Sequence, residues 1–167
     1  MDNIIIREMR ESDNGPIEKL IREVLLEHKA DKPGTAFFDS NLHQLFQSFQ
    51  APYSVYWVAE QNGTVIGGSG IYPTPGLPKG YCELVKLYLH PQARGKGIGI
   101  KLISACFSSA ISAGYSHIYL ETMPELSKAA SIYQKMGFQY LTQPLGDSGH
   151  YSCNVWMSRS LFNLSQL

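Results

Sequence analysis

The amino-acid sequence predicts a mixed α/β fold in which one sheet is flanked by helices. Two strand-like runs, 55–60 and 64–72, flank the pair Asn62-Gly63. An Asn-Gly pair between β-type runs is a strong hairpin signal. In the second half of the chain, strand-like and helix-like segments alternate, which is typical of strands joined by helices within one sheet.

The first half predicts a strand and two helices before the hairpin. Residues 4–9, which begin with three isoleucines, predict the first strand. Ser12 and Asp13 are helix-capping residues, and apolar side chains recur after them at helical spacing as far as Leu25. Residues 39–50 predict a second helix, because apolar side chains fall on one helical face. These side chains are Leu42, Leu45, Phe46 and Phe49.

The second half predicts strands and helices in alternation. The strands are expected at 81–89, 117–121, 138–141 and 151–157, and the helices at 98–113 and 125–135. The sequence contains no internal repeat, linker or low-complexity segment. Its 167 residues are enough to bury one substantial core. We therefore expect residues 1–167 to form a single domain.

Composition narrows the class of protein. Hydrophobic residues make up 44% and charged residues 17% of the chain, and the formal net charge is zero. The chain has no excess of basic residues of the kind that would indicate a nucleic-acid partner. No apolar run approaches the ~20 residues of a membrane span, and the N-terminus shows no secretory signal. We therefore expect a cytoplasmic protein with no membrane or nucleic-acid partner.

Cysteine and histidine residues show no pattern of a metal site. Cys82, Cys106 and Cys153 are isolated and odd in number, and buried thiols are favoured over nucleophiles or metal ligands. None of the five histidines stands at metal-ligand spacing. We expect no metal.

A glycine-rich turn follows the strand at 81–89. Gly95, Gly97 and Gly99 lack side chains, so a ligand can approach the backbone closely. The helix that follows leaves its first N–H groups without partners, which makes this turn suited to a diphosphate. A turn without a ligand is the alternative, but three alternate glycines cost helix stability, and this favours the ligand.

Two common phosphate-binding patterns fail at this turn. A dinucleotide fingerprint would need glycine at Ile100, and an ATP-binding loop would need glycine at His90 and Ser or Thr at Gly97. The pattern that fits is R-x-x-G-x-G, from Arg94 to Gly99. With the apolar strand before it, this turn resembles the acetyl-CoA signature of the GNAT superfamily of N-acetyltransferases.

The resemblance implies a fold and a co-substrate. GNAT proteins have a mixed, mostly antiparallel central sheet flanked by helices, and they use acetyl-CoA without a metal. In that family the backbone N–H groups of the turn hold the CoA pyrophosphate, and the resemblance implies that backbone N–H groups of the splayed strand around Leu87 to Leu89 donate to the oxyanion. Members are often homodimers. Carried over to this chain, the cofactor-binding residues are Leu87, Tyr88, Leu89, Arg94, Gly95, Lys96, Gly97, Ile98 and Gly99.

Acyl transfer to an amine requires a base, a donor to the oxyanion and an acid for the leaving thiolate. Glu83 is the candidate base. It lies on the strand before the turn, six residues before Leu89, so period-two counting puts it on the face of Leu87 and Leu89. Several GNAT enzymes have a glutamate at the matching point, acting directly or through water. The alternative is a carboxylate at a strand end beside a solvated loop.

Tyr133 is the candidate acid. Tyr133, Gly137 and Phe138 match the Y-x-x-x-G-F element of the family, whose tyrosine hydroxyl approaches the CoA sulfur. A phenol of pKa ~10 can donate a proton to a thiolate. The alternative is a core tyrosine on an amphipathic helix.

One position departs from the family pattern. Many members carry asparagine seven residues before the tyrosine, where it bonds to the pantetheine arm, and this chain has Leu126 there. Either Ser127 substitutes for the asparagine or that contact is lost.

The resemblance leaves the acceptor open. It implies direct transfer of an acetyl group to a primary amine of a small molecule, an amino-acid derivative or a peptide. Phe37, Phe38, Asp147 and His150 are candidates to line the acceptor site. A non-catalytic domain that senses acyl-CoA is the alternative function, and the presence of both Glu83 and Tyr133 favours the enzyme.

Overall fold

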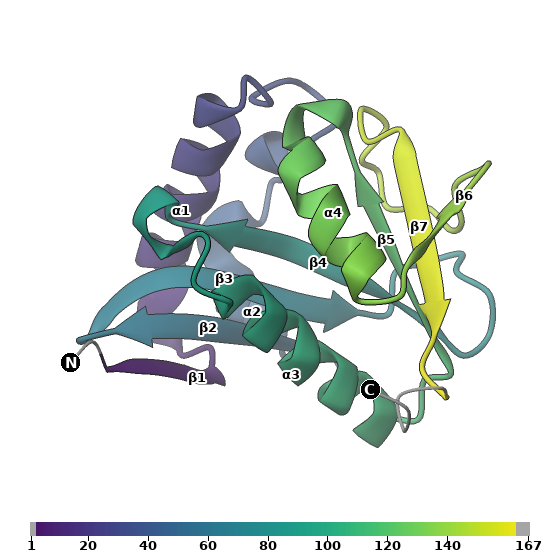
Figure 1. The fold of residues 1–167 in the computed structure, drawn as a ribbon, viewed down its shortest axis with the longest axis horizontal. Coiled ribbons are helices and arrows are strands. Elements are labelled where there is room, and N and C mark those ends of the chain that lie inside the picture. Colours follow the sequence, from purple (N-terminus) through teal and green to yellow (C-terminus); the bar gives the residue numbers. More distant parts are fainter. Residues whose placement is uncertain (1–2, 163–167) are drawn as a thin grey trace.

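A computed structural model describes residues 3–162 and shows one seven-stranded sheet (Figure 1). The strands are β1 (Ile4–Glu8), β2 (Val55–Gln61), β3 (Thr64–Tyr72), β4 (Tyr81–Leu89), β5 (His117–Thr122), β6 (Gln139–Leu141) and β7 (Val155–Ser160). Their order is β1-β2-β3-β4-β5-β7-β6. All neighbours are antiparallel except β4 and β5, which are parallel, so the predicted mixed, mostly antiparallel sheet is confirmed.

Helices cover both faces of this sheet. They are α1 (Asn14–Glu27), α2 (Leu45–Ser48), α3 (Ile98–Ser112) and α4 (Ser127–Lys135). Two of them, α3 and α4, lie in front of the sheet in Figure 1, and α1 lies behind it. Each face has its own apolar core, with Ile17 and Ile21 of α1 buried on one side and Ile103 and Phe107 of α3 on the other. The sheet is therefore the middle layer, and both of its faces are covered.

The predicted helix at 39–50 is shorter and more irregular than expected. The structure has a 3₁₀ turn, Leu42–Gln44, followed by the single α-helical turn of α2. The side chain of Asn14 accepts the N–H of Phe46 at 2.8 Å. This bond from α1 satisfies an N–H group early in α2, where no earlier helical turn supplies a carbonyl. Leu42 and Leu45 are still buried as the helical pattern predicted.

The last strand begins later than predicted. β7 starts at Val155, whereas the sequence indicated a strand over 151–157. The residues before it are held by loop contacts instead, since the Ser152 N–H donates to the Gly34 carbonyl at 3.2 Å and the Cys153 N–H to the His150 carbonyl at 3.0 Å. Residues 142–154 therefore form a loop that packs beside the segment around Gly34.

β4 and β5 part from one another within the sheet. Their pairing runs from Tyr81 opposite His117 to Glu83 opposite Tyr119 and ends there. The rest of β4 stays paired with β3 and has no pairing with β5. A parallel pair that diverges in this way opens a gap at the carboxyl ends of the strands, which is where ligands commonly bind in sheets of this kind.

β4 also contains a bulge that changes which side chains share a face. Lys86 has φ of +52°, and the register with β3 shifts at this point. A bulge adds one residue and inverts the alternation beyond it. Leu87 therefore packs with Leu84 in the core beside α3, whereas Val85 and Tyr88 pack toward α1.

The bulge corrects one sequence-based prediction. Glu83 was expected on the face of Leu87 and Leu89, because period-two counting assumes a regular strand. That prediction is wrong: Glu83 precedes Leu84 on the opposite face, and the inserted residue at Lys86 puts Leu87 and Leu89 on the side of Leu84. Glu83 therefore lies on the face of β4 that carries Val85 and Tyr88, away from Leu87 and Leu89.

Candidate functional site

The glycine turn between β4 and α3 leaves open space above its backbone. Gly95 and Gly97 have φ of +74° and +75°, a conformation that L side chains rarely adopt. A Cβ at either position would meet no atom within 4 Å. Gly97 precedes α3 directly, so the unpaired N–H groups of the first helical turn face a space that side chains do not fill. This geometry suits a phosphate group.

A groove of about 500 Å³ runs from this turn along β4 to α4. α4 lies over the place where β4 and β5 part (Figure 1). Leu87 and Leu89 line the groove from β4, and Ala129 and Ile132 line it from α4. Apolar walls that end at an anion-binding turn fit a long, largely neutral chain attached to a diphosphate, which is the shape of CoA.

Most of the predicted cofactor-binding residues meet in this groove. The residues that line it are Leu87, Tyr88, Leu89, Arg94, Gly95, Gly97, Ile98 and Gly99. The Arg94 guanidinium is held by both carboxylate oxygens of Glu27, each at 2.8 Å, and by the Leu89 carbonyl at 3.1 Å. Arg94 thus fastens the turn to α1 and β4.

Two predicted cofactor-binding residues do not line the groove. Lys96 is exposed at the tip of the turn, and Ser127 is exposed at the first position of α4. One helical turn later, Ser131 does line it, as do the unassigned basic residues His28 and Lys128. The geometry therefore does not support Ser127 as the substitute for the family asparagine, because Ser127 is exposed at the start of α4 and does not border the groove.

Tyr133 is a buried residue of α4 that borders the groove. It is 7% exposed, lines the groove and packs edge-on against Phe138 with ring centroids 5.8 Å apart. Burial raises the pKa of the Tyr133 phenol. The hydroxyl therefore stays protonated at neutral pH and is available as a donor. Tyr133 therefore fits both predictions made from the sequence. Its ring packs in the core, as for a core tyrosine, and the residue also borders the groove, as a catalytic acid must.

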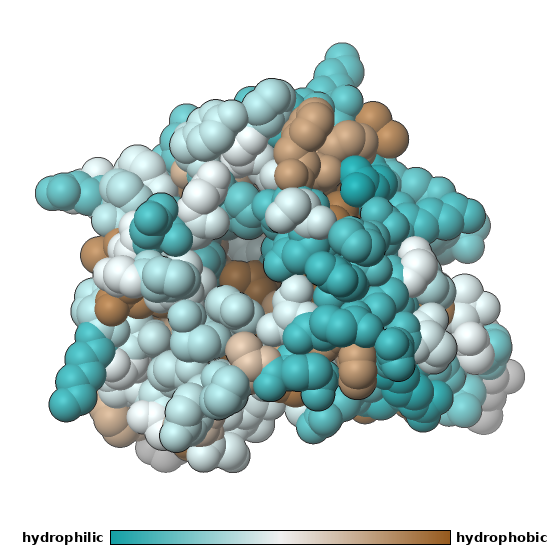
Figure 2. All heavy atoms as spheres, turned by 180° about the vertical axis from the view of Figure 1, so that it is seen from behind, coloured by the Kyte–Doolittle hydropathy of each residue, from teal (hydrophilic) through white to brown (hydrophobic). Residues whose placement is uncertain are grey.

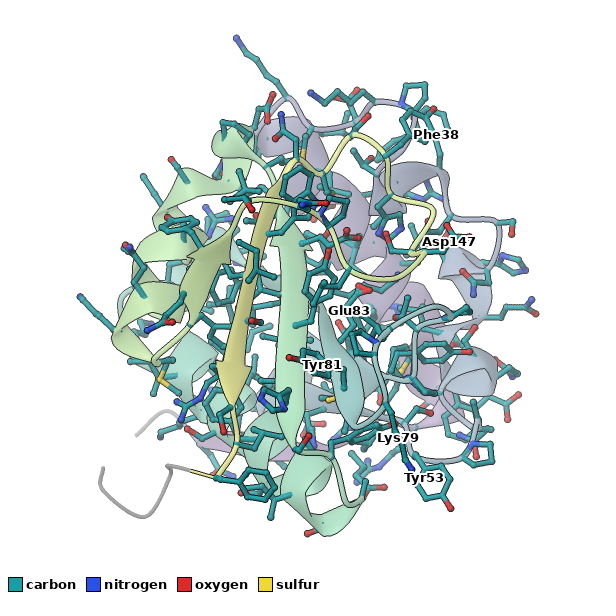
Figure 3. The ribbon with its side chains drawn as sticks, turned by 90° about the vertical axis from the view of Figure 1, so that its right-hand side faces the viewer. Phe38, Tyr53, Lys79, Tyr81, Glu83 and Asp147 are labelled. Carbon is teal, nitrogen blue, oxygen red and sulfur yellow. The ribbon has the colours of Figure 1, made fainter. Side chains whose placement is uncertain are left out.

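Glu83 lies in the interior, on the other side of β4 from the core beside α3. It is 4% exposed, and the Thr74 hydroxyl donates to its Oε1 at 3.0 Å. Burial, and secondly the nearby carboxylate of Glu121, raises its pKa to about 7. The alternative prediction, that Glu83 is a carboxylate at a solvated strand end, is wrong because the side chain is buried. Figure 3 shows Glu83 inside the molecule, whereas Phe38 and Asp147 lie on the outer loops.

A second cavity, of about 60 Å³, adjoins Glu83. Leu84, Lys86, Tyr88, Glu121, Thr122 and Leu126 line both this cavity and the long groove. Because the two cavities share these residues, a group in the small cavity lies next to the inner part of the groove.

Asp39 links its own loop to β4 and to the loop before β7, close to the small cavity. Its Oδ2 accepts from Lys86 Nζ and its Oδ1 pairs with His150 Nε2, both at 2.8 Å. Burial acts to raise the Asp39 pKa, but the hydrogen bond from His150 and the charge of Lys86 leave it below its ordinary value. The carboxylate is therefore ionised at neutral pH, and it holds the loop before β7 against β4.

Of the four residues predicted to line the acceptor site, His150 lines the small cavity and Phe37, Phe38 and Asp147 do not. His150 lines the small cavity, together with Thr35 and Ala36. Phe37 packs under Arg22, whose guanidinium carbon lies 4.9 Å from the ring centroid, and Phe38 is 57% exposed. The Asp147 N–H donates to the Pro75 carbonyl at 2.8 Å, in the neighbouring loop.

Sequence reasoning missed Glu121 and Asp39. Glu121 ends the predicted strand at 117–121, and its place at the carboxyl end of a strand parallel to β4 was a signal that could have identified it. Asp39 gave no such signal, because its partners Lys86 and His150 are 47 and 111 residues away in sequence.

Neither a metal cluster nor a membrane-spanning helix occurs within residues 3–162. In that range no three His, Cys, Asp or Glu side chains are placed to hold a metal ion. None of the helices there is long and apolar enough to cross a bilayer.

Cys82 and Cys106 are buried, as predicted. Cys153 is partly exposed, and burial of its thiol raises the pKa to about 12.

Comparison with known sequences identifies related acetyltransferases. The sequence model of the acetyltransferase (GNAT) family matches residues 19–138. An uncharacterized N-acetyltransferase of Escherichia coli K12, YjgM, is 39% identical over 159 residues, which are 94% of this chain and 95% of that protein. The thialysine N-epsilon-acetyltransferase of Mus musculus is 32% identical over 161 residues, covering 84% and 87% of the two chains.

The fold is also shared with a solved acetyltransferase. The structure of yncA from Salmonella typhimurium, described with its cofactor acetyl-CoA, superposes with a TM-score of 0.75. The match covers 95% of this chain and 94% of the other at 23% identity. At that identity the likeness concerns the fold.

Proposed function

This chain belongs to the GNAT family of acetyltransferases, and we propose that it moves the acetyl group of acetyl-CoA directly to a primary amine of a small molecule, an amino-acid derivative or a peptide. It is an acyltransferase with acetyl-CoA as donor. The observation that carries the acceptor half of the proposal is the small cavity beside Glu83, which shares its lining with the long groove. An amine placed there lies next to the place where a thioester at the inner end of the groove would be.

The residues of the groove have distinct tasks in this proposal. The backbone of Gly95 and Gly97 and the first turn of α3 bind the pyrophosphate, as their open space and unpaired N–H groups favour. Leu87 and Ile132 hold the pantetheine arm between β4 and α4 and exclude water from it. Bound acetyl-CoA supplies an activated thioester, whose carbon–sulfur bond breaks as the new carbon–nitrogen bond forms.

Glu83 and Tyr133 would move the two protons of the reaction. An amine enters as an ammonium ion and must lose a proton before its nitrogen can attack. Glu83 is suited to take it, because a pKa of about 7 leaves a substantial fraction of the carboxylate ionised near neutrality. Tyr133 keeps its proton there, so its hydroxyl can donate to the departing sulfur. A sensor of acyl-CoA would need neither the raised pKa of Glu83 nor the second cavity.

The relatives guide the choice of acceptors to test. The mouse relative is named for acetylation of the ε-nitrogen of thialysine, a primary amine on an unbranched side chain. Linear aliphatic amines, diamines, basic amino acids and short peptides therefore form the first panel.

The test is release of free CoA thiol from acetyl-CoA with each acceptor of the panel. We expect acceptor-dependent release, with the acetylated amine identified by mass spectrometry. If no acceptor causes thiol release but calorimetry shows tight CoA binding, the protein is a non-catalytic sensor of acyl-CoA. If there is neither thiol release nor CoA binding, the assignment of the groove as the CoA site is contradicted. Light scattering on the same sample measures whether the protein is the homodimer that the family resemblance implies.

A further inference from the structure

Glu121 lies where the two cavities meet. It is the penultimate residue of β5, two positions after Tyr119, which pairs with Glu83 on β4. It lines both the long groove and the small cavity. A carboxylate at this point borders both the inner end of the groove and the space next to Glu83.

Hydroxyl groups fix the orientation of the Glu121 carboxylate. The Tyr119 hydroxyl donates to Oε2 at 2.7 Å and in turn accepts the Leu145 N–H at 3.1 Å. The Ser148 hydroxyl donates to Oε1 and accepts the His150 N–H at 3.1 Å. These donors are neutral, so they orient the carboxylate without cancelling its charge.

The lysine beside the cavity is already paired. Lys86 lines the cavity and is held by Asp39 at 2.8 Å, and the other oxygen of Asp39 lies 2.8 Å from His150 Nε2. Glu83 accepts from a neutral donor, Thr74, and Glu121 also accepts from neutral donors. Glu83 and Glu121 border one small cavity, and neither forms a salt bridge among residues 3–162. Lys86, which Asp39 already holds, compensates their negative charge only in part. A cationic ligand would compensate the remainder.

We propose that Glu121 is an acceptor-binding residue, which together with Glu83 forms a two-carboxylate site for the ammonium group of a primary aliphatic amine. This inference rests on the proposed function and names the acceptor class within it. The cavity of about 60 Å³ has room for an aminomethyl group and little more. The amine is therefore carried on an unbranched carbon. Glu121 holds the ammonium group, and Glu83 takes its proton.

A structural role for Glu121 is the competing explanation. Through Tyr119 and Ser148 it also holds the loop at 142–154 against β5, so its loss would affect any acceptor alike. The two roles differ in their dependence on acceptor charge. An amine that is neutral at the assay pH gains nothing from a carboxylate, whereas an ammonium ion does.

The experiment compares two acceptors in the wild type and in Glu121→Gln. One is an unbranched aliphatic amine, which is cationic at pH 7.5. The other is aminoacetonitrile, whose amine is also carried on a CH₂ group but is neutral at that pH because the nitrile withdraws electrons. For the cationic acceptor we expect kcat/KM to fall about 10- to 100-fold in Glu121→Gln, mainly through KM, as for loss of a charge-assisted bond. For the neutral acceptor we expect a change of less than about threefold. Glu23→Gln is the matched control, because Glu23 is exposed on α1.

Binding measurements keep the inference testable if chemistry is slow. Calorimetry of the aliphatic amine with the CoA-bound protein should show affinity about 10-fold weaker or worse in Glu121→Gln. Ser148→Ala keeps the charge and removes one orienting bond, so it should weaken binding less. Equal losses for both acceptors, or no loss of amine affinity, would overturn the inference. Absence of turnover in the wild type, with amine binding that depends on Glu121, would contradict the proposed function alone.

The pH profile gives a readout that a purely structural role would not move. Glu121 contributes to the raised pKa of Glu83, after burial, so Glu121→Gln should shift the acid limb of kcat/KM for the neutral acceptor to lower pH. An unchanged limb would count against proximity of the two carboxylates in solution. The other titratable groups around the pair are Asp39, Lys86, Tyr88, Tyr119, His150 and Cys153.

Discussion

The donor side and the acceptor side of this site are built in different ways. The donor groove depends mainly on backbone: the edge of β4 that parts from β5, and the turn in which Gly95 and Gly97 have positive φ. The acceptor cavity depends on side chains from four separate segments, which contribute Asp39, Lys86, Glu121 and His150. The face of the molecule behind the sheet, shown in Figure 2, is hollowed near its middle, with apolar side chains at the bottom.

The difference explains how one architecture can keep its donor and vary its acceptor. A backbone site tolerates side-chain substitution at most positions and fails where a Cβ would enter the groove. A side-chain site changes its specificity with single charges while the fold remains. Substitutions on the donor side should therefore act on CoA affinity, and those on the acceptor side should act on turnover or on the KM of the amine.

Glu83→Gln should have the largest effect and should spare the donor side. The amide cannot accept a proton, so we expect kcat to fall about 10²- to 10⁴-fold, the range for loss of a general base. CoA affinity measured by calorimetry should stay within about twofold of the wild type. In the wild type, kcat/KM should rise with pH and level off above about 7, where Glu83 is ionised. A wild-type profile that is flat from pH 5 to 9 would contradict this role.

The same substitution should stabilise the protein at high pH. Because the Glu83 pKa rises from 4.5 in the unfolded chain to about 7 on folding, the folded state binds more protons between these values. The free energy of unfolding of the wild type should therefore fall as pH rises through this window. Glutamine removes the loss, so Glu83→Gln should be more stable than the wild type at pH 8 by about 1–3 kcal/mol. At pH 4 the two should be alike in urea unfolding.

Gly97→Val tests the donor side alone. A valine at φ +75° projects into the open space above the turn, so CoA affinity should fall about 100-fold or more. Gly114→Val is the matched control, because Gly114 has φ of +91° and open space but lies after α3, away from the groove. Both variants carry similar backbone strain and should lose similar stability in thermal unfolding. Equal CoA affinity in the two variants would show that the phosphates bind elsewhere.

Tyr133→Phe should have a smaller effect, confined to turnover. The ring and its packing on Phe138 remain, so stability and CoA affinity should change little. Loss of the hydroxyl should lower kcat about 100-fold, the lower end of the range for loss of a general acid. Tyr140→Phe is the control, since Tyr140 is 53% exposed on β6. Equal turnover in the two variants would leave Tyr133 as a core residue.

The donor side was predictable from sequence because its determinants are local. The glycines, the strand before them and the helix after them are contiguous, and of the residues predicted between Leu87 and Gly99 all but Lys96 line the groove. The acceptor side was not predictable in this way, because no local sequence pattern indicates that Asp39 and His150 are in contact. The bulge at Lys86 was equally hidden, since a lysine with φ of +52° is held there by tertiary contacts and not by its own preference.

Asp39→Asn is the mildest of these tests and acts only on the acceptor side. The amide keeps the shape but leaves Lys86 without a counter-charge and loosens the loop that carries His150. We expect the KM of the amine to rise about 3- to 10-fold, with kcat and CoA affinity nearly unchanged. Asp31→Asn, at an exposed position in the same segment, is the control. A change in CoA affinity instead would mean that the donor groove and the acceptor cavity are coupled through more than the residues that line both.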